Sequence, residues 1–116
     1  MSIDKNILRL DHILRSIEKI EFLTHDLDYE TYLDDWVKQD AIIRNAEIIG
    51  EAIANIDGWL KDKYPEVAWQ PAKSMRNFLI HEYFEVDYDA VWVTLNKDLP
   101  ILKQQIAAIL NELMRG

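Results

Sequence analysis

One stretch of the sequence carries side chains suited to cleaving a phosphate ester. Residues 76–83 read Arg-Asn-Phe-Leu-Ile-His-Glu-Tyr, which places a guanidinium, an amide, an imidazole and a phenol within eight residues. His81 titrates near neutral pH and can take or give a proton, while Arg76 presents a charged planar fork to phosphate oxygens. Asn77 can fix the tautomer of His81 through a hydrogen bond. These groups suffice for RNA cleavage by attack of the RNA's own 2′-hydroxyl, a route that needs neither a metal nor a protein nucleophile.

The residues just before this stretch extend its anion-binding chemistry. Pro71 suits the first turn of a helix, and the free N–H groups of such a turn favour anions. Lys73 and Ser74 lie in the same turn, so we expect both to bind RNA phosphate. Residues 61–81 are also the only clearly basic part of the chain, with four Lys or Arg against two acidic residues.

Helical geometry sets a condition on this site. At ~100° per residue, Arg76 and Tyr83 nearly eclipse each other, whereas Arg76 and His81 point ~140° apart. The catalytic pair can address one atom if the helix bends near His81, if long side chains wrap around it, or if a second subunit completes the site. We favour the last two together, because a symmetric dimer would place two copies of the motif across one cleft.

A purely structural interpretation of the same residues is also open. His81 could be a core histidine, Arg76 could pair with Glu82, and Tyr83 could pack against Trp92. Burial of Arg76 and His81 away from any cleft or subunit interface would favour this interpretation.

Apolar residues at three- and four-residue steps predict an all-α fold. The expected helices span residues 3–24 (capped by Ser2), 29–33, 36 to about 61, 71 to about 84–86 (with the motif), 88 onward (capped by Asp87), and a last one to about 114. A new helix could begin at Asn96 or Asp98, before Pro100, or one continuous helix could kink at Pro100. The pattern predicts one domain over residues 1–116, an up-and-down bundle of four main helices with short accessory helices.

Composition narrows the class of protein further. The 116 residues suit one domain, and 49% of them are hydrophobic, enough to bury a core. No apolar run approaches the ~20 residues of a membrane span, and the N-terminus lacks a signal-peptide pattern. With no cysteines either, we expect a cytoplasmic protein without disulfides. We expect no metal and no cofactor, since His12 and His25 show no ligand spacing.

Charge is unevenly distributed along the chain. The formal net charge is −8, and an acidic surface repels phosphate backbones, which argues against nonspecific nucleic-acid binding. Residues 26–40 combine acidic residues with Tyr29, Tyr32 and Trp36. This stretch is either a solvated region of helix caps and packing aromatics or a protein interface for a basic partner.

The sequence as a whole resembles the HepT-like ribonuclease toxins of the HEPN superfamily. The resemblance is carried by residues 75–87, which hold the motif, and by four further stretches in the same order. These are residues 42–52, 65–69, 91–92 and 98–102. The resemblance therefore covers nearly the whole chain, which makes it more specific than the motif alone.

The resemblance implies an endoribonuclease toxin of a type II toxin–antitoxin system. It implies a helical bundle of the HEPN type that forms a homodimer or a higher oligomer, with both motifs in a shared cleft. Arg76 and His81 would then be the catalytic pair, supported by Asn77, with RNA as substrate. Tyr83 would accept AMP from a nucleotidyltransferase antitoxin of the MNT type. The added phosphate would block the anion site beside Arg76 and silence the toxin.

One residue departs from the family's common pattern. Glu82 follows His81 where glycine is frequent, and its carboxylate opposes RNA phosphate. Together with the acidic net charge, Glu82 motivates an alternative function. In that alternative the chain is a non-enzymatic helical module that binds nucleotide or protein and partners a nucleotidyltransferase.

Overall fold

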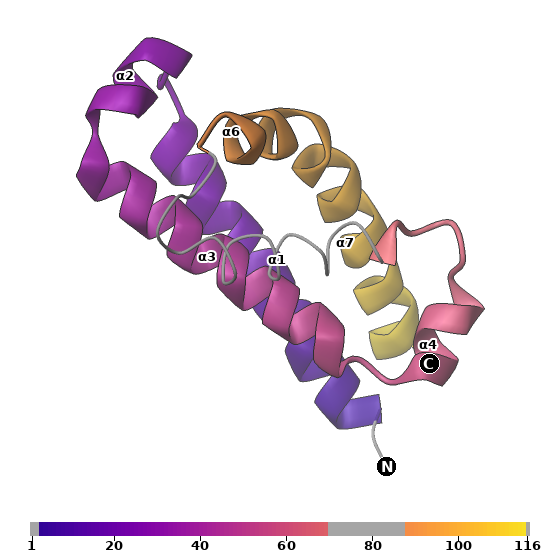
Figure 1. The fold of residues 1–116 in the computed structure, drawn as a ribbon. Coiled ribbons are helices and arrows are strands. Elements are labelled where there is room, and N and C mark those ends of the chain that lie inside the picture. The colour runs from indigo at the N-terminus through magenta and orange to yellow at the C-terminus, as the bar shows by residue number, and fades with distance from the viewer. Residues whose placement is uncertain (1–2, 70–87, 116) are drawn as a thin grey trace.

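Every regular element that the structure describes is a helix. The computed structural model describes residues 3–69 and 88–115. Figure 1 shows its helices, which are α1 (Ile3–Thr24), α2 (Tyr29–Asp34), α3 (Trp36–Asn55), α4 (Gly58–Lys63), α6 (Tyr88–Lys97) and α7 (Leu99–Arg115). The predicted all-α bundle is confirmed. The helix predicted to carry the motif lies outside the described residues.

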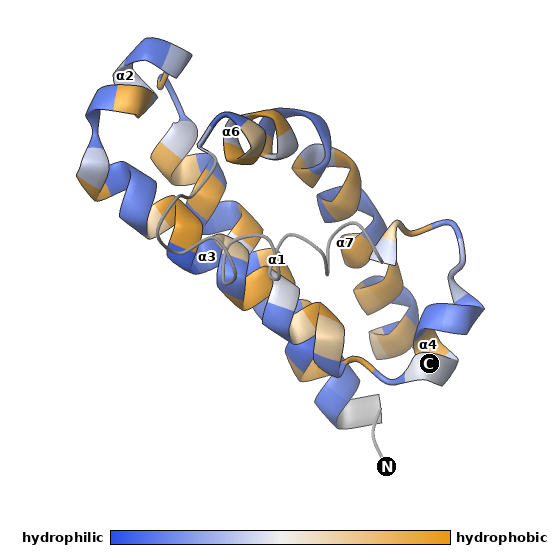
Figure 2. Ribbon diagram, viewed as in Figure 1, coloured by the Kyte–Doolittle hydropathy of each residue, from blue (hydrophilic) through white to orange (hydrophobic). Residues whose placement is uncertain are grey.

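The centre of the bundle is formed by α1, α3 and α7. α1 packs along α3 and against α7, while α6 packs on α7 and α2 on α3. Apolar positions of these helices turn toward one another and polar positions turn outward (Figure 2). Fully buried side chains from the three central helices include Leu10, Ile13, Ile17, Ile42, Ile49, Ile53 and Ile106. We call these three packed helices the frame, because α2 and α6 pack on them.

The helix predictions made from local patterns are confirmed in three places. α1 has the predicted bounds, and α2 extends one residue beyond the prediction. In α6, Val91 and Leu95 are buried while Tyr88 and Trp92 pack against the core, so the predicted apolar face is the inward one.

Acidic caps start two consecutive helices, as expected from the sequence. The carboxylate of Asp28 accepts a hydrogen bond from the Thr31 N–H at 2.8 Å, and the carboxylate of Asp35 accepts one from the Lys38 N–H at 3.0 Å. Each bond satisfies an N–H group that the first helical turn leaves free. The hydrogen bond from Thr31 also lowers the pKa of Asp28 from its ordinary value, because it favours the charged carboxylate.

The prediction of one long helix from Trp36 to about Lys61 is wrong. α3 ends at Asn55, and the backbone turns out of the helix before α4 begins. The cause lies far away in sequence: Asn6 is fully buried, and its amide needs partners. Its Nδ2 donates to Asp57 Oδ2 at 3.2 Å, and its Oδ1 accepts from the Asp57 N–H at 3.2 Å. In a continuous helix, the Asp57 N–H would instead donate to the carbonyl four residues earlier in the chain.

The expected kink at Pro100 is also wrong, whereas the alternative of a restart at Asp98 is confirmed. α6 ends at Lys97 and α7 begins at Leu99, with a clear change of direction between them (Figure 1). The carbonyl of Asp98 accepts from the Leu102 N–H at 3.0 Å. Pro100 then lies in the first turn of α7, where its missing N–H costs nothing.

Candidate functional site

All six predicted site residues lie outside the described part of the chain. Lys73, Ser74, Arg76, Asn77, His81 and Tyr83 fall within residues 70–87, which we call the motif segment. Their mutual geometry and their roles stay predictions. The structure describes instead the two borders of the motif segment, which are the leading loop (residues 64–69) and an aromatic cluster at the start of α6.

The leading loop is fixed onto α7 by hydrogen bonds. Tyr64 is buried and its hydroxyl donates to Glu112 Oε1 at 2.9 Å. Gln105 donates its amide to the carbonyl of Glu66 at 3.2 Å. At the end of the loop, the indole N–H of Trp69 donates back to the Tyr64 carbonyl at 3.0 Å. These bonds place the residue before the motif segment against the central bundle.

Tyr64 keeps its proton at neutral pH. Burial raises the pKa of its phenol from the ordinary value of 10.0, and the hydrogen bond and negative charge of Glu112 raise that pKa further. The phenol is therefore a stable donor, and the contact with Glu112 persists across the physiological range.

The aromatic cluster holds the other border against α2. It consists of Tyr29, Tyr32, Tyr88 and Trp92. Tyr32 is fully buried, its ring centroid lies 4.7 Å from that of Trp92, and its hydroxyl donates to the Tyr88 carbonyl at 2.8 Å. The Tyr29 hydroxyl donates to the Asp89 carboxylate. The residue that follows the motif segment is thus held by packing and by a hydrogen bond from a buried side chain.

The length of the chain limits how far the predicted site residues can lie from the two borders. A chain spans at most ~3.6 Å per residue. Tyr83 precedes Tyr88 by five residues, so its Cα lies within ~18 Å of the Cα of Tyr88. Arg76 follows Trp69 by seven residues, which limits that separation to ~25 Å. The predicted chemistry is therefore tethered near both borders.

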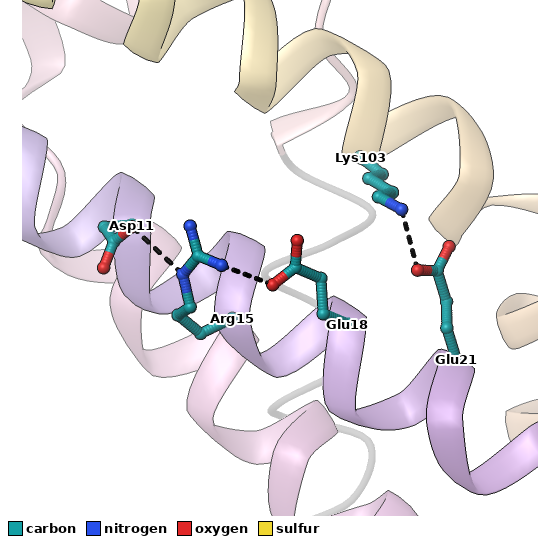
Figure 3. A network of polar contacts seen from close by, with 5 residues as sticks. All are labelled: Asp11, Arg15, Glu18, Glu21 and Lys103. Atoms are coloured by element: carbon teal, nitrogen blue, oxygen red, sulfur yellow. Dashed lines mark hydrogen bonds and ion pairs between the residues drawn. The ribbon is translucent and has the colours of Figure 1, made fainter.

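Several basic side chains of the frame are neutralised by acidic neighbours. Arg15 lies between Asp11 and Glu18 and pairs with both (Figure 3). Lys103 of α7 reaches across to Glu21 of α1, with 2.8 Å between its Nζ and Oε1. This hydrogen bond raises the pKa of Lys103 from its ordinary value. Cations that are paired in this way have little capacity left to bind phosphate.

A groove on the described surface does not match the predicted chemistry. It lies between α1 and α3, has a volume of about 530 Å³, and is lined by Arg9, His12, Arg44, Glu47 and Glu51 among others. Its charges balance, and Arg9 donates to the Asn55 carbonyl at 2.6 Å, at the end of α3. A neutral groove of this kind has no preference for an anionic ligand.

Over the described ranges 3–69 and 88–115, no three His, Cys, Asp or Glu side chains gather as metal ligands would. His25 lies 3.4 Å from the Asp26 carboxylate on the surface. Within the same ranges, no helix is both long and apolar enough to cross a membrane.

Sequence reasoning missed the residues that hold the borders of the motif segment. Tyr64 and Glu112 were not singled out, whereas for Tyr32 the sequence left packing and a protein interface open, and its complete burial confirms packing. The sequence contains one signal that could have found Tyr32. Residues 29–36 and 88–92 hold five tyrosines and tryptophans, spaced by three or four residues within each segment.

Comparison with known proteins gives a consistent result. A family model described as "Ribonuclease HepT-like" matches residues 13–109. A protein of Thermococcus cleftensis named "Probable ribonuclease HepT" is 44% identical over 94 residues, which cover 81% of this chain and 86% of the relative. A "Putative RNase" of Caldanaerobacter subterraneus is 37% identical, covering 89% of this chain and 92% of the relative.

One relative is much longer than this chain. A protein of Methanocaldococcus jannaschii named "Gamma-glutamylcyclotransferase and putative RNase" is 43% identical over 104 residues. The match covers 90% of this chain but only 47% of that relative. No solved structure matches the chain significantly.

Proposed function

Because the chain belongs to the ribonuclease HepT-like family, we propose that it is a metal-independent endoribonuclease toxin of a type II toxin–antitoxin system. The observation that carries this proposal is the family match over residues 13–109, which contains the whole of the 76–83 motif. The relatives named as ribonucleases support the same reaction class.

The proposed reaction uses the RNA as its own nucleophile. The 2′-hydroxyl attacks the adjacent phosphorus, the P–O5′ bond breaks, and the products carry a 2′,3′-cyclic phosphate and a 5′-hydroxyl. His81 transfers a proton in this step, and Arg76 stabilises the extra negative charge on the five-coordinate phosphorus. Asn77 orients His81, and Lys73 and Ser74 bind the flanking phosphates.

A homodimer is part of the proposal. Arg76 and His81 diverge by ~140° on one straight helix, so two copies of the motif across a shared cleft supply a converging pair more readily than one copy does.

Silencing by a nucleotidyltransferase antitoxin completes the proposal. Transfer of AMP from ATP joins the Tyr83 oxygen to the α-phosphorus and releases pyrophosphate. Tyr83 nearly eclipses Arg76 on a helix, so the attached phosphate would occupy the anion site and repel RNA.

Cleavage of a defined RNA in EDTA tests the ribonuclease. The wild type should leave 2′,3′-cyclic phosphate ends, and a substrate with 2′-deoxyribose at the cleaved position should stay intact. His81→Ala and Arg76→Ala should each lose at least about 100-fold in rate. His12→Ala and Arg44→Ala, at two exposed positions in the α1–α3 groove, serve as matched controls and should keep full activity. Equal activity in His81→Ala and His12→Ala would refute the assignment.

The non-enzymatic module is the second candidate function, favoured by the net charge of −8. It predicts no RNA cleavage by the wild type, but a mass gain of one AMP or more on Tyr83 when the nucleotidyltransferase and ATP are present. Growth arrest on expression separates the two functions in cells. The ribonuclease should arrest growth, whereas its His81→Ala variant and a non-enzymatic module should not.

A further inference from the structure

The end of the molecule formed by α2 combines exposed apolar side chains with concentrated negative charge. We call residues 21–40 the acidic tip. It holds seven of the 21 acidic residues of the chain and one of its 13 Lys or Arg, which leaves 14 acidic and 12 basic residues elsewhere. The ten large apolar side chains exposed among the described residues include five in the acidic tip, namely Phe22, Tyr29, Leu33, Trp36 and Val37.

The junction between α2 and α3 makes the acidic tip rigid. Gln39 is buried, and its amide donates to the carbonyls of Tyr32 at 2.9 Å and Leu33 at 3.0 Å. The caps provided by Asp28 and Asp35 fix the starts of both helices. A surface that is already ordered pays little conformational entropy on binding, so the acidic tip is preorganised for a partner.

Charge decides which kind of partner fits. RNA would be repelled, since its phosphates meet acidic residues. A second copy docked tip to tip would bring two sets of like charges together, which costs free energy. A protein with a basic surface meets the acids as counter-charges, and Trp36, which is 69% exposed, provides an apolar anchor of the type that dominates protein interfaces.

The acidic tip also lies near the predicted acceptor of AMP. Tyr32 of the tip donates directly to the carbonyl of Tyr88, and Tyr83 lies within ~18 Å of Tyr88 by chain length alone. That separation is smaller than the ~30 Å diameter of a small folded domain. A domain of that size seated on the acidic tip is wide enough to span the largest separation that the chain allows between Tyr88 and Tyr83.

We propose that the acidic tip is the docking surface for the nucleotidyltransferase that modifies Tyr83. The negative charge of the tip calls for basic residues on the face of the nucleotidyltransferase that meets it. The inference rests on the proposed function and adds to it the place where the partner binds and the residues that recognise it.

A charge reversal with a matched control tests the docking surface. Glu30→Lys/Asp34→Lys changes two exposed acids of the tip that do not cap a helix. Asp62→Lys/Glu66→Lys changes two exposed acids in and after α4, at the opposite end of the molecule (Figure 1). Titration of the purified nucleotidyltransferase should show a Kd raised at least about tenfold for the tip variant and changed less than about twofold for the control.

A second variant and its control test the apolar anchor. Trp36→Ala should weaken binding by at least about tenfold, whereas Trp59→Ala should leave it unchanged, since Trp59 is exposed in α4. Raising the salt concentration should weaken binding of the wild type more than that of the tip charge variant. All four variants should match the wild type in circular dichroism and in melting temperature, which tests whether they fold.

The outcomes separate the docking surface from the proposed function. Equal Kd values for tip and control variants, with Tyr83 still modified, overturn the docking surface and leave the proposed function intact. Weaker binding by the tip variants without any mass gain on Tyr83 supports the docking surface and overturns the silencing step. A change of oligomeric state in the tip variants identifies a second copy as the occupant and overturns the docking surface. Failure of the wild type to bind the nucleotidyltransferase also overturns the docking surface.

Discussion

The two borders of the motif segment are held by contacts of different character. In the aromatic cluster, Tyr32 is fully buried, packs on Trp92, and donates its hydrogen bond to a neutral carbonyl. In the leading loop, Tyr64 is also buried, but its acceptor is the carboxylate of Glu112, which faces solvent. The first border ends on a neutral acceptor within apolar packing, whereas the second ends on a charged acceptor in contact with water.

This difference indicates what each border contributes. Apolar burial is worth ~25 cal/mol per Å² and does not depend on pH, so the aromatic cluster should dominate the stability of the end near α2. A hydrogen bond to an exposed carboxylate is worth much less, because water competes for the acceptor. The leading loop should therefore be the border that responds to changes in protonation.

The largest expected effect is the loss of the Tyr32 ring. Tyr32→Ala removes a fully buried aromatic side chain and should lower the free energy of unfolding by about 3–5 kcal/mol, measured by urea denaturation. Tyr29→Ala, at a position that is 36% exposed, is the control and should cost clearly less. A loss below about 1 kcal/mol for Tyr32→Ala would contradict the dominance of the aromatic cluster.

Removing only the hydroxyl should have an intermediate effect. Tyr32→Phe keeps the ring on Trp92 but takes the donor away from the Tyr88 carbonyl, at a cost of about 1 kcal/mol. The gap between Tyr32→Phe and Tyr32→Ala in the same denaturation experiment measures the packing of the ring. If both variants lose the same free energy, the hydrogen bond and not the packing holds this border.

At the leading loop, the charge of Glu112 should matter little. Glu112→Gln keeps an acceptor oxygen for Tyr64 and removes the charge, so the free energy of unfolding should change by less than about 1 kcal/mol. Thermal denaturation at neutral pH measures it. A larger loss would show that the carboxylate holds the loop through its charge, and would remove the contrast between the two borders.

The smallest expected effect appears only at alkaline pH. Since the folded state raises the pKa of Tyr64 above its ordinary value of 10.0, the stabilisation by the neutral phenol is complete below that value. It is then lost as the pH rises through the folded-state pKa. The melting temperature of the wild type should therefore fall more steeply above about pH 10 than that of Tyr64→Phe. Parallel curves would show that Tyr64 titrates as it does in the unfolded chain.

Local patterns predicted the helices whose causes are local. The apolar spacing of α1 and the acidic caps of α2 and α3 act within a few residues, so the sequence displays them directly. The end of α3 was missed because the partner of Asp57 is Asn6, 51 residues away. Nothing in the sequence around Asp57 reveals that a buried amide requires its N–H.

The candidate site also has features with local causes and features with long-range causes. The residue types and spacing of Arg76, Asn77 and His81 suggested a reaction class but left a purely structural interpretation open. The resemblance over nearly the whole chain pointed to a ribonuclease, and the family match over residues 13–109 agrees with it. The contacts that hold the borders join residues 56 and 48 positions apart, in Tyr32–Tyr88 and Tyr64–Glu112. Such contacts follow from the packing of the bundle, which single-sequence patterns do not specify.

The pairing of Asn6 with Asp57 has a consequence for the order in which the chain is made. Both residues leave the ribosome before residues 76–83, and α1 and α3 pack directly on each other. N-terminal portions of a chain generally begin to fold during synthesis. The first half of the frame can therefore begin to assemble before the residues proposed to cut RNA have left the ribosome.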